Sequence, residues 1–378
     1  MLSRQSPLNI VHTCTLLFLA ILCKPSLNLA QGDTWTKKAD MPTARGALST
    51  SVVNGIIYAI GGSAGGANPA GVAIVQAYDP ATNIWTNKSN MPTLRVIFST
   101  SVVDGKIYAI GGQRSLGAPD LSTVEMYDPA TNTWSRKADM PTPRRELAAS
   151  AVDGKIYAIG GLRGGSQQRL VEAYDPATDT WTQKEFMPTA RGALAAGVVN
   201  GKIYAVGGDD IQQRRTIVEE YDPATNTWAR KADMPTPKVF LSAATTNGKL
   251  YVFGGSPNSF PNNPVIAIVE EFDPTTNTWT RRADMPTARS FLAASTVNEK
   301  VYAIGGFTTG FPYTPTSTVE EYAPPGLTSV ELSSPGHRNP KKFTLQQNYP
   351  NPFWSEATSP ARSVSVSHNF LLDTEEKN

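Results

Sequence analysis

Short apolar runs separated by turn residues recur along most of the chain, in a unit of 47 to 51 residues that can be counted from its tryptophans. The unit begins W-T-x-K-A-D-M-P-T-x-R. It continues through V-N/D-G-K-I-Y-A-I-G-G and a variable segment, and it ends with V-E-x-Y-D-P-A-T-N-T. Short apolar runs bounded by Gly, Pro and Asn predict strands rather than helices. The pattern predicts four strands in each copy. The tryptophans are Trp35, Trp85, Trp134, Trp181, Trp228 and Trp279.

Turn residues set the connections between these strands. An Asn-Gly or Asp-Gly pair lies between the first and second strand of five copies, and such pairs supply the two positive-φ residues of a type I′ hairpin. The sixth copy has Asn298-Glu299 instead. Because Glu disfavours a positive φ, we expect a different turn there. An Asp-Pro-Ala-Thr-Asn turn, as in 79–83, joins the third strand to the fourth.

The repeated unit resembles the kelch repeat over residues 33–325. The resemblance implies an all-β fold, a six-bladed kelch-type β-propeller with four antiparallel strands in each blade. The chain begins with a lone fourth strand around Trp35 and ends with a third strand that runs from Val319 to Tyr322. We therefore expect the N-terminal strand to complete the last blade, which leaves no exposed sheet edge.

Large aromatic residues occupy the same register in every copy, and we expect them to fill the wedges between blades. A carbohydrate-stacking role is the alternative, but a residue required in every copy is explained more simply by the repeated interior. Besides the tryptophans they are Tyr58, Tyr108, Tyr157, Tyr204, Tyr251 and Tyr302.

The amino-acid composition limits which partners, catalytic groups and metal sites the repeats can have. Lys plus Arg number 34 and Asp plus Glu 32, so no overall positive field favours nucleic acid. Every Cys and His lies near an end of the chain, which excludes thiol or imidazole catalysis, disulfides and the usual zinc or copper sites in the repeats. We expect no cofactor and no metal site. These five residues are His12, Cys14, Cys23, His337 and His368.

The N-terminal residues 1–30 have the order of a secretory signal peptide. Arg4 precedes an apolar run from Ile10 to Leu22, and Ala30 ends a small-residue approach to a cleavage site. A membrane anchor is the alternative, but about 13 apolar residues are too few to cross roughly 30 Å of hydrocarbon. We expect a secreted protein with no membrane span after cleavage.

After the propeller, residues 31–325, a Ser- and Pro-rich linker is expected at 326–341. The run from Lys342 to Phe353, K-F-T-L-Q-Q-N-Y-P-N-P-F, resembles the start of the C-terminal sorting domain of type IX secretion substrates of diderm bacteria. Because residues 342–378 are short and lack strand alternation, we interpret them as a truncated or frameshifted remnant. The resemblance implies a periplasmic or outer-surface location.

Binding is expected on the face that carries the Met-Pro-Thr connections and the variable segments, because variable loops on a rigid scaffold carry specificity. One cation recurs there at the start of each innermost strand. A ring of positive charge at the channel mouth would suit carboxylate, sulfate or phosphate groups. Alternatively, each cation pairs with an aspartate five residues earlier, at Asp40, Asp139, Asp233 or Asp284. The cations are Arg45, Arg95, Arg144, Arg191, Lys238 and Arg289.

Positions that depart from the repeat are further candidates for ligand binding. Arg145-Glu146 replaces small or apolar residues, and Glu185-Phe186 replaces Ala-Asp. One variable segment carries charged groups, and two others carry amide and aromatic groups. This mixture suits the binding of sugars or peptides. The alternative is that these segments are ordinary solvated loops. The charged candidates are Asp209, Asp210, Arg214 and Arg215, and the others are Asn258, Phe260, Asn262, Asn263, Phe307, Phe311 and Tyr313.

Two functions follow from these features. The first is a noncatalytic, monomeric binding module for a protein or a glycan, an acidic one included. The second is an enzyme similar to the sialic-acid mutarotases, which are secreted six-bladed kelch proteins, with Glu146 beside Arg145 and Arg191 as the acid/base and cation set. Copper-radical oxidases share the propeller, but the His ligands and the crosslinking Cys that they need are missing here. An intracellular adaptor conflicts with the signal peptide.

Overall fold

The structure is a computed structural model that describes residues 32–66, 70–210, 213–214, 216–258 and 264–326. The predicted signal segment and sorting-domain remnant lie outside the described residues, and so does nearly all of the predicted linker. None of the described residues belongs to a helix long and apolar enough to cross a membrane.

The described strands form six four-stranded antiparallel sheets, each ordered from the innermost strand outwards. Blade 1 consists of β2 (Ser49–Val53), β3 (Ile56–Ile60), β4 (Val75–Asp79) and β5 (Ile84–Lys88). Blade 2 consists of β6 (Ser99–Val103), β7 (Lys106–Ile110), β8 (Val124–Asp128) and β9 (Thr133–Lys137). Blade 3 consists of β10 (Ala148–Val152), β11 (Lys155–Ile159), β14 (Val171–Asp175) and β15 (Thr180–Gln183). Blade 4 consists of β16 (Ala195–Val199), β17 (Lys202–Val206), β20 (Val218–Asp222) and β21 (Thr227–Arg230). Blade 5 consists of β22 (Ser242–Thr246), β23 (Lys249–Phe253), β24 (Val269–Asp273) and β25 (Thr278–Arg282). Blade 6 consists of β26 (Ala293–Val297), β27 (Lys300–Ile304), β28 (Val319–Ala323) and β1 (Thr34–Lys37).

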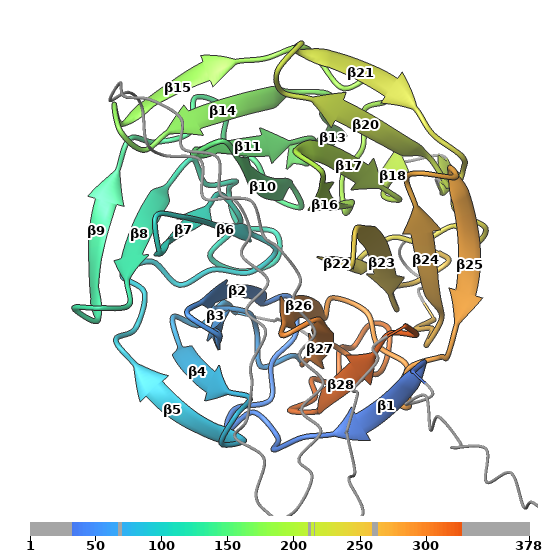
Figure 1. Ribbon diagram of the computed structural model, residues 1–378. Helices are drawn as coiled ribbons and strands as arrows, with labels where there is room; N and C mark the ends of the chain where they lie inside the picture. The colour runs from blue at the N-terminus through green and yellow to red at the C-terminus, as the bar shows by residue number, and fades with distance from the viewer. Residues whose placement is uncertain (1–31, 67–69, 211–212, 215, 259–263, 327–378) are drawn as a thin grey trace, which may run out of the picture. The chain divides into compact units, whose positions relative to one another are not determined.

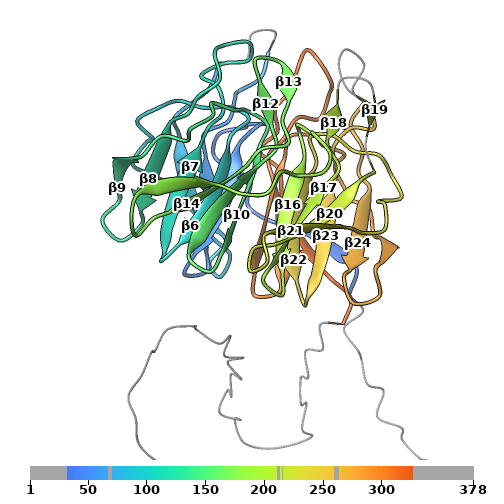
Figure 2. The same cartoon turned by 90° about the horizontal axis from the view of Figure 1, so that it is seen from above.

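The six sheets surround a central axis as the blades of a β-propeller, which confirms the predicted fold (Figure 1). Two short ribbons, β12 (Leu162–Arg163) with β13 (Ser166–Gln167) and β18 (Asp209–Asp210) with β19 (Gln213–Arg214), lie in the variable segments. They lie at one end of the propeller, away from the tight hairpins (Figure 2). We call this end the loop face and the opposite end the hairpin face.

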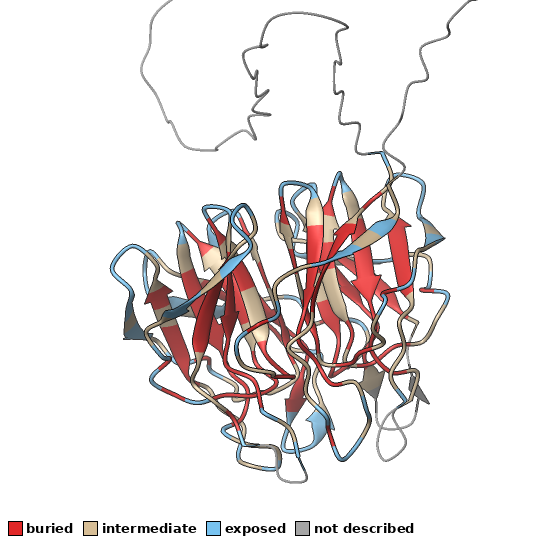
Figure 3. Cartoon of the chain, turned by 90° about the horizontal axis from the view of Figure 1, so that it is seen from below, coloured by how far each residue is buried: buried red, intermediate tan, exposed pale blue. Residues whose placement is uncertain are grey.

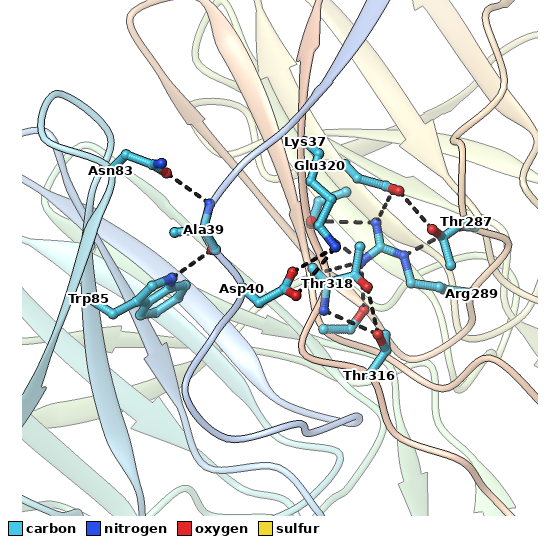
Figure 4. A network of polar contacts seen from close by, with 12 residues as sticks. Lys37, Ala39, Asp40, Asn83, Trp85, Thr287, Arg289, Thr316, Thr318 and Glu320 are labelled. Carbon is cyan, nitrogen blue, oxygen red and sulfur yellow. Dashed lines mark hydrogen bonds and ion pairs between the residues drawn. The ribbon is translucent and has the colours of Figure 1, made fainter.

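The N-terminal strand closes the ring, as predicted. β1 pairs with β28 in the register Trp35 to Tyr322. Beyond β1, the backbone of Ala39 donates to Asn83 Oδ1 at 2.9 Å and accepts from Trp85 Nε1 at 3.0 Å, and both partners belong to the outer hairpin of blade 1 (Figure 4). The two ends of the propeller are therefore joined by strand pairing and by side chains, which removes the free sheet edge.

The described core consists of six interblade clusters and a seventh, smaller cluster around Ile97 and Phe307, rather than one centre. The second and third strands of each blade are almost wholly buried, whereas the outer strands alternate between exposed and half-buried residues (Figure 3). One cluster packs Tyr58 and Ile60 of blade 1 against Phe98 and Tyr127 of blade 2. The predicted packing role of the repeated tyrosines is confirmed, because all six are buried.

The prediction of a different turn in the sixth hairpin is wrong. Asn298 and Glu299 have φ values of 49° and 64°, the same left-handed pair that Asn54 and Gly55 adopt at 51° and 76°. The pairing of Val297 with Lys300 fixes a two-residue loop, and in addition Thr246 Oγ1 donates to the Glu299 carbonyl at 3.1 Å. The sheet register and the neighbouring blade thus impose a conformation that Glu disfavours.

Glu299→Gly should therefore raise the free energy of unfolding by about 1 kcal/mol, because glycine adopts this φ without the penalty of a Cβ. Chemical denaturation of both proteins measures the difference. Gly105→Glu makes the reverse change in the second hairpin and should lower stability by a similar amount. An unchanged midpoint for both variants would contradict the proposed strain.

Candidate functional site

A closed ring of backbone hydrogen bonds lies at the loop-face end of the innermost strands. In each blade one residue has φ between 49° and 55°, and its N–H donates to the carbonyl of the equivalent residue in the preceding blade at 2.9 to 3.1 Å. Six such bonds return to their starting point. We call these residues the mouth ring: Ala47, Ile97, Glu146, Ala193, Phe240 and Phe291.

The mouth ring holds non-glycine residues in the left-handed region, which disfavours side chains that carry a Cβ. Ile97 is β-branched, for which a φ of 49° is a genuine outlier. Strained backbone of this kind persists only where the surroundings enforce it, and it concentrates at functional sites. Here the six hydrogen bonds enforce it, and the side chains of the ring line the mouth of the channel.

These side chains line a pocket of about 100 Å³, the mouth pocket, whose floor is formed by the next residue of each blade. Phe240 and Phe291 stack with centroids 3.9 Å apart and planes 17° apart. Phe291 also contacts Phe307 and Tyr313 edge-on. In the order of the ring Glu146 lies three blades from Phe291, so an aromatic wall and a carboxyl group occupy opposite sides of the pocket. The floor residues are Leu48, Phe98, Leu147, Leu194, Leu241 and Leu292.

Glu146 is the one ionisable member of the mouth ring. Its side chain is 15% exposed, and Arg145 Nε lies 3.7 Å from its Oε1. Burial raises the pKa of Glu146 to about 7; the positive charge of Arg145 opposes the shift, and the negative charges of Asp120 and Asp209 add to it. The carboxyl group therefore changes its charge near neutral pH, as a group poised for proton transfer or for a charged ligand does.

Arg145 is held mainly by another partner. Its Nη1 donates to Asp120 Oδ1 at 2.8 Å. Asp120 in turn accepts from Gln113 Nε2 at 3.0 Å and from the Gly164 backbone at 2.8 Å. Arg145 and Asp120 also line a groove of about 610 Å³ between the loops of blades 2 and 3, together with Arg163 and Gly165. The groove and the mouth pocket are thus lined by residues adjacent in sequence, Arg145 and Glu146.

The six repeated cations do not form the predicted ring of charge at the mouth. All six are fully buried inside their blades, at 0% exposure. The prediction that they lie exposed at the channel mouth is therefore wrong. Five pair with a glutamate of the third strand at 2.6 to 2.9 Å, and the guanidinium groups also donate to carbonyls at the end of the second strand. Figure 4 shows this arrangement for Arg289, Glu320 and Thr287. The pairs are Arg95–Glu125, Arg144–Glu172, Arg191–Glu219, Lys238–Glu270 and Arg289–Glu320; the sixth cation is Arg45.

The alternative prediction, pairing with the aspartate five residues earlier, has the wrong partner. Those aspartates form exposed i,i+3 pairs on the outer strands instead, because the Met-Pro turn that follows them leads the chain inwards to the cation. The pairs are Lys37–Asp40, Arg136–Asp139, Arg230–Asp233 and Arg281–Asp284.

Blade 1 departs from this scheme. Gln76 occupies the glutamate position, and its Oε1 accepts from Arg45 Nη2 at 2.9 Å. Burial lowers the pKa of Arg45 to about 10, with no carboxylate partner to offset the shift. Gln76 Nε2 also donates to Thr43 at 3.3 Å, where the other blades have a Thr hydroxyl donating to the glutamate, as Thr93 does to Glu125 at 2.8 Å.

Gln76→Glu should therefore raise the free energy of unfolding at pH 7 by about 1.5 to 3 kcal/mol, the range for hydrogen bonds to charged groups. Thermal unfolding measured by calorimetry provides the comparison. Glu172→Gln makes the reverse change in blade 3 and should lower the melting temperature. If Gln76→Glu lowered it instead, the Arg45 site would not be equivalent to the other five.

The variable-segment candidates are only partly described. The Asp209 backbone pairs with Gly192 and with Arg214, and this ribbon is next to the mouth ring. Asp210 and Arg214 belong to the ribbon strands, while Arg215 lies outside the described residues. Phe307 and Tyr313 are buried against the mouth ring, and Phe311 is half exposed. The backbone N–H of Asn258 donates to Ser256 Oγ at 3.2 Å. Phe260, Asn262 and Asn263 lie outside the described residues.

Comparing repeats in register would have identified more of the site. Phe240 and Phe291 lie two residues after the repeated cation, the same register as Glu146. Their strain and their stacking become visible only in the closed ring. Asp120 carries no sequence signal, because its role depends on the adjacent loop. No group of three or more His, Cys, Asp or Glu able to hold a metal ion occurs among the described residues.

Glu146→Gln should stabilise the protein above pH 7 and not at pH 4. Because the pKa of Glu146 is raised in the folded state, stability is lost as pH rises from about 4.5 to 7 and the buried carboxyl ionises. Removing that ionisation should raise the free energy of unfolding by about 1 to 3 kcal/mol at pH 8. Denaturant titrations at the two pH values measure it, with Glu299→Gln on the hairpin face as the matched control. An equal gain at both pH values would contradict the raised pKa.

Comparisons with known proteins agree with this architecture. The KLHDC2/KLHL20/DRC7 Kelch-repeats domain matches residues 163–323, and the Kelch motif matches residues 44–92 and 95–141. No curated protein matches the sequence. Among solved structures, one titled "Structure of YjhT" is similar with a TM-score of 0.64 and 17% identity, over 75% of this chain and 96% of that chain. At this identity the likeness concerns the fold alone.

Proposed function

For a chain of kelch repeats folded into a six-bladed β-propeller, we propose the function of a secreted, noncatalytic binding module that recognises a glycan at the mouth pocket. The observation that carries the proposal is the mouth ring itself. It sets a carboxyl group, Glu146, across from the stacked rings of Phe240 and Phe291. Aromatic rings and a few polar groups around a concave site are the usual elements of a small-molecule site.

A glycan fits the loop face better than a flat protein surface does. Over the described residues, the exposed large apolar side chains are scattered, at Ile84, Leu94 and Phe311. A stable protein interface needs a contiguous, partly apolar patch of about 800 Å² on each partner. The described residues of this face form two hollows, the mouth pocket and the groove beside Arg145, which suit a chain-like polar ligand.

The ionisation of Glu146 also supports a binding role. A carboxyl group whose burial disfavours its charge destabilises the fold at neutral pH. Residues that reduce stability are retained where function requires them. Glu146 departs from the small or apolar residues of the other copies, so no repeated structural need explains it.

Anomer exchange of the sialic-acid mutarotase type is the second candidate, favoured by one observation. A pKa of about 7 suits a group that both accepts and donates a proton at neutral pH. In this reading Arg145 would hold the sugar carboxylate. Arg191, the other cation expected in that set, is fully buried against Glu219 and does not reach the pocket. Such a ligand would also have to displace Asp120 from Arg145.

Secretion rests on sequence. The order of residues in 1–30 supports export through a cleaved signal, and the run from Lys342 to Phe353 supports a periplasmic or outer-surface location in a diderm bacterium. Both remain proposals, and both fit a protein that meets glycans outside the cytoplasm.

A glycan array tests the binding function. The purified protein should bind a defined set of glycans, and Glu146→Gln should reduce that binding at least tenfold, since the carboxyl group and its hydrogen bonds are lost. Glu299→Gln makes the same chemical change on the hairpin face and should bind normally. Absence of binding to any glycan would overturn the proposal and favour a protein ligand. Exchange of sugar anomers, lost in Glu146→Gln, would favour the enzyme.

A further inference from the structure

We propose that the mouth pocket accepts a positively charged amino group, so that the glycan it recognises carries free amines, as a de-N-acetylated amino sugar does. This inference rests on the proposed glycan-binding function and adds the chemical class of the ligand. It reverses the expectation of an acidic ligand, which depended on a ring of exposed cations.

The size of the pocket limits what can enter it. Its volume of about 100 Å³ is smaller than the roughly 150 Å³ of an engineered cavity that holds a benzene ring. An amino group and its carbon match a space of this size more closely than a complete sugar ring does. The groove of about 610 Å³ that is lined by Arg145, the sequence neighbour of Glu146, has room for the sugar rings that bear such a substituent.

The charges around the pocket favour a cation. Two carboxyl groups, those of Asp120 and Glu146, share one described cation, whose Nε lies 3.7 Å from Glu146 Oε1. The facing cation is Arg145, whose guanidinium is already bound to Asp120 at 2.8 Å. An added positive charge beside Glu146 would favour its ionised form and relieve the cost of burying that charge.

Among the side chains that the structure describes, the other cations near the mouth do not line the pocket. Five of the six repeated cations are neutralised by glutamates inside their own blades. Arg45, the sixth, is fully buried and donates to Gln76 and to backbone carbonyls rather than into the pocket. Arg163 is exposed and lines the groove, not the mouth pocket.

The aromatic wall completes the site. The stacked Phe240 and Phe291 line the pocket together with Glu146, and an outer face of this stack would attract an ammonium group within about 6 Å of the ring centre. An acidic group and aromatic rings around one small pocket are a combination that recognises an amine and disfavours a carboxylate.

Titration calorimetry at pH 6.5 with three tetrasaccharides tests the inference: glucosamine tetramer, N-acetylglucosamine tetramer and galacturonic acid tetramer. We expect the glucosamine tetramer to bind at least tenfold more tightly than the other two. Equal or tighter binding of the acetylated or the acidic tetramer would overturn the amine assignment while leaving glycan binding intact. Binding of none of the three, together with an empty glycan array, would overturn the proposed function and this inference with it.

Two variants locate the amine. Glu146→Gln should reduce the affinity for the glucosamine tetramer at least tenfold, and Glu299→Gln should not change it. Phe240→Leu keeps an apolar side chain but removes the ring face, and should weaken the same ligand about fivefold. Glucosamine binding that survives both Glu146→Gln and Phe240→Leu would place the amine elsewhere and overturn the proposal.

Discussion

The structure depends on one buried cation in each blade. In blade 3, Arg144 reaches from the start of the innermost strand to Glu172 on the third strand and to the carbonyl of Gly160, which directly follows the second. The Arg144 carbonyl accepts the Gly112 N–H of the preceding blade at 2.9 Å. A single residue therefore ties three strands of its own blade and the adjacent blade together. Because the pair is buried, removal of either partner would leave an uncompensated charge.

This constraint explains the paired glycines. Gly111 and Gly112 both have positive φ, and a Cβ on Gly111 would lie 2.5 Å from the Arg144 carbonyl oxygen. Only glycine allows the blades to approach this closely. Cation, glutamate and glycines act as one unit, and a change in any of them would disturb the contact between blades. The mouth ring follows two residues after the cation, so its strained backbone is positioned by the same contacts.

The rigid scaffold leaves the mouth ring free to vary. The six positions share one backbone conformation and one set of hydrogen bonds, yet they carry Ala, Ile, Glu, Ala, Phe and Phe. Side chains can change there without altering the fold, since none of them pairs with the buried cations. Specificity in this propeller is thus carried by side chains on a fixed ring as well as by variable loops.

The sequence by itself determined the repeat, the four strands of each blade, the closure by the N-terminal strand and the packing role of the tyrosines. These follow from local turn chemistry and periodicity, which each copy repeats. Tertiary structure alone decided where the charges lie. Arg144 precedes Glu172 by 28 residues, so their pairing depends on how the blade folds back, and the nearer Asp139 was the misleading partner. Likewise, Glu146, Phe240 and Phe291 are far apart in sequence, and only closure of the ring through space brings them around one pocket.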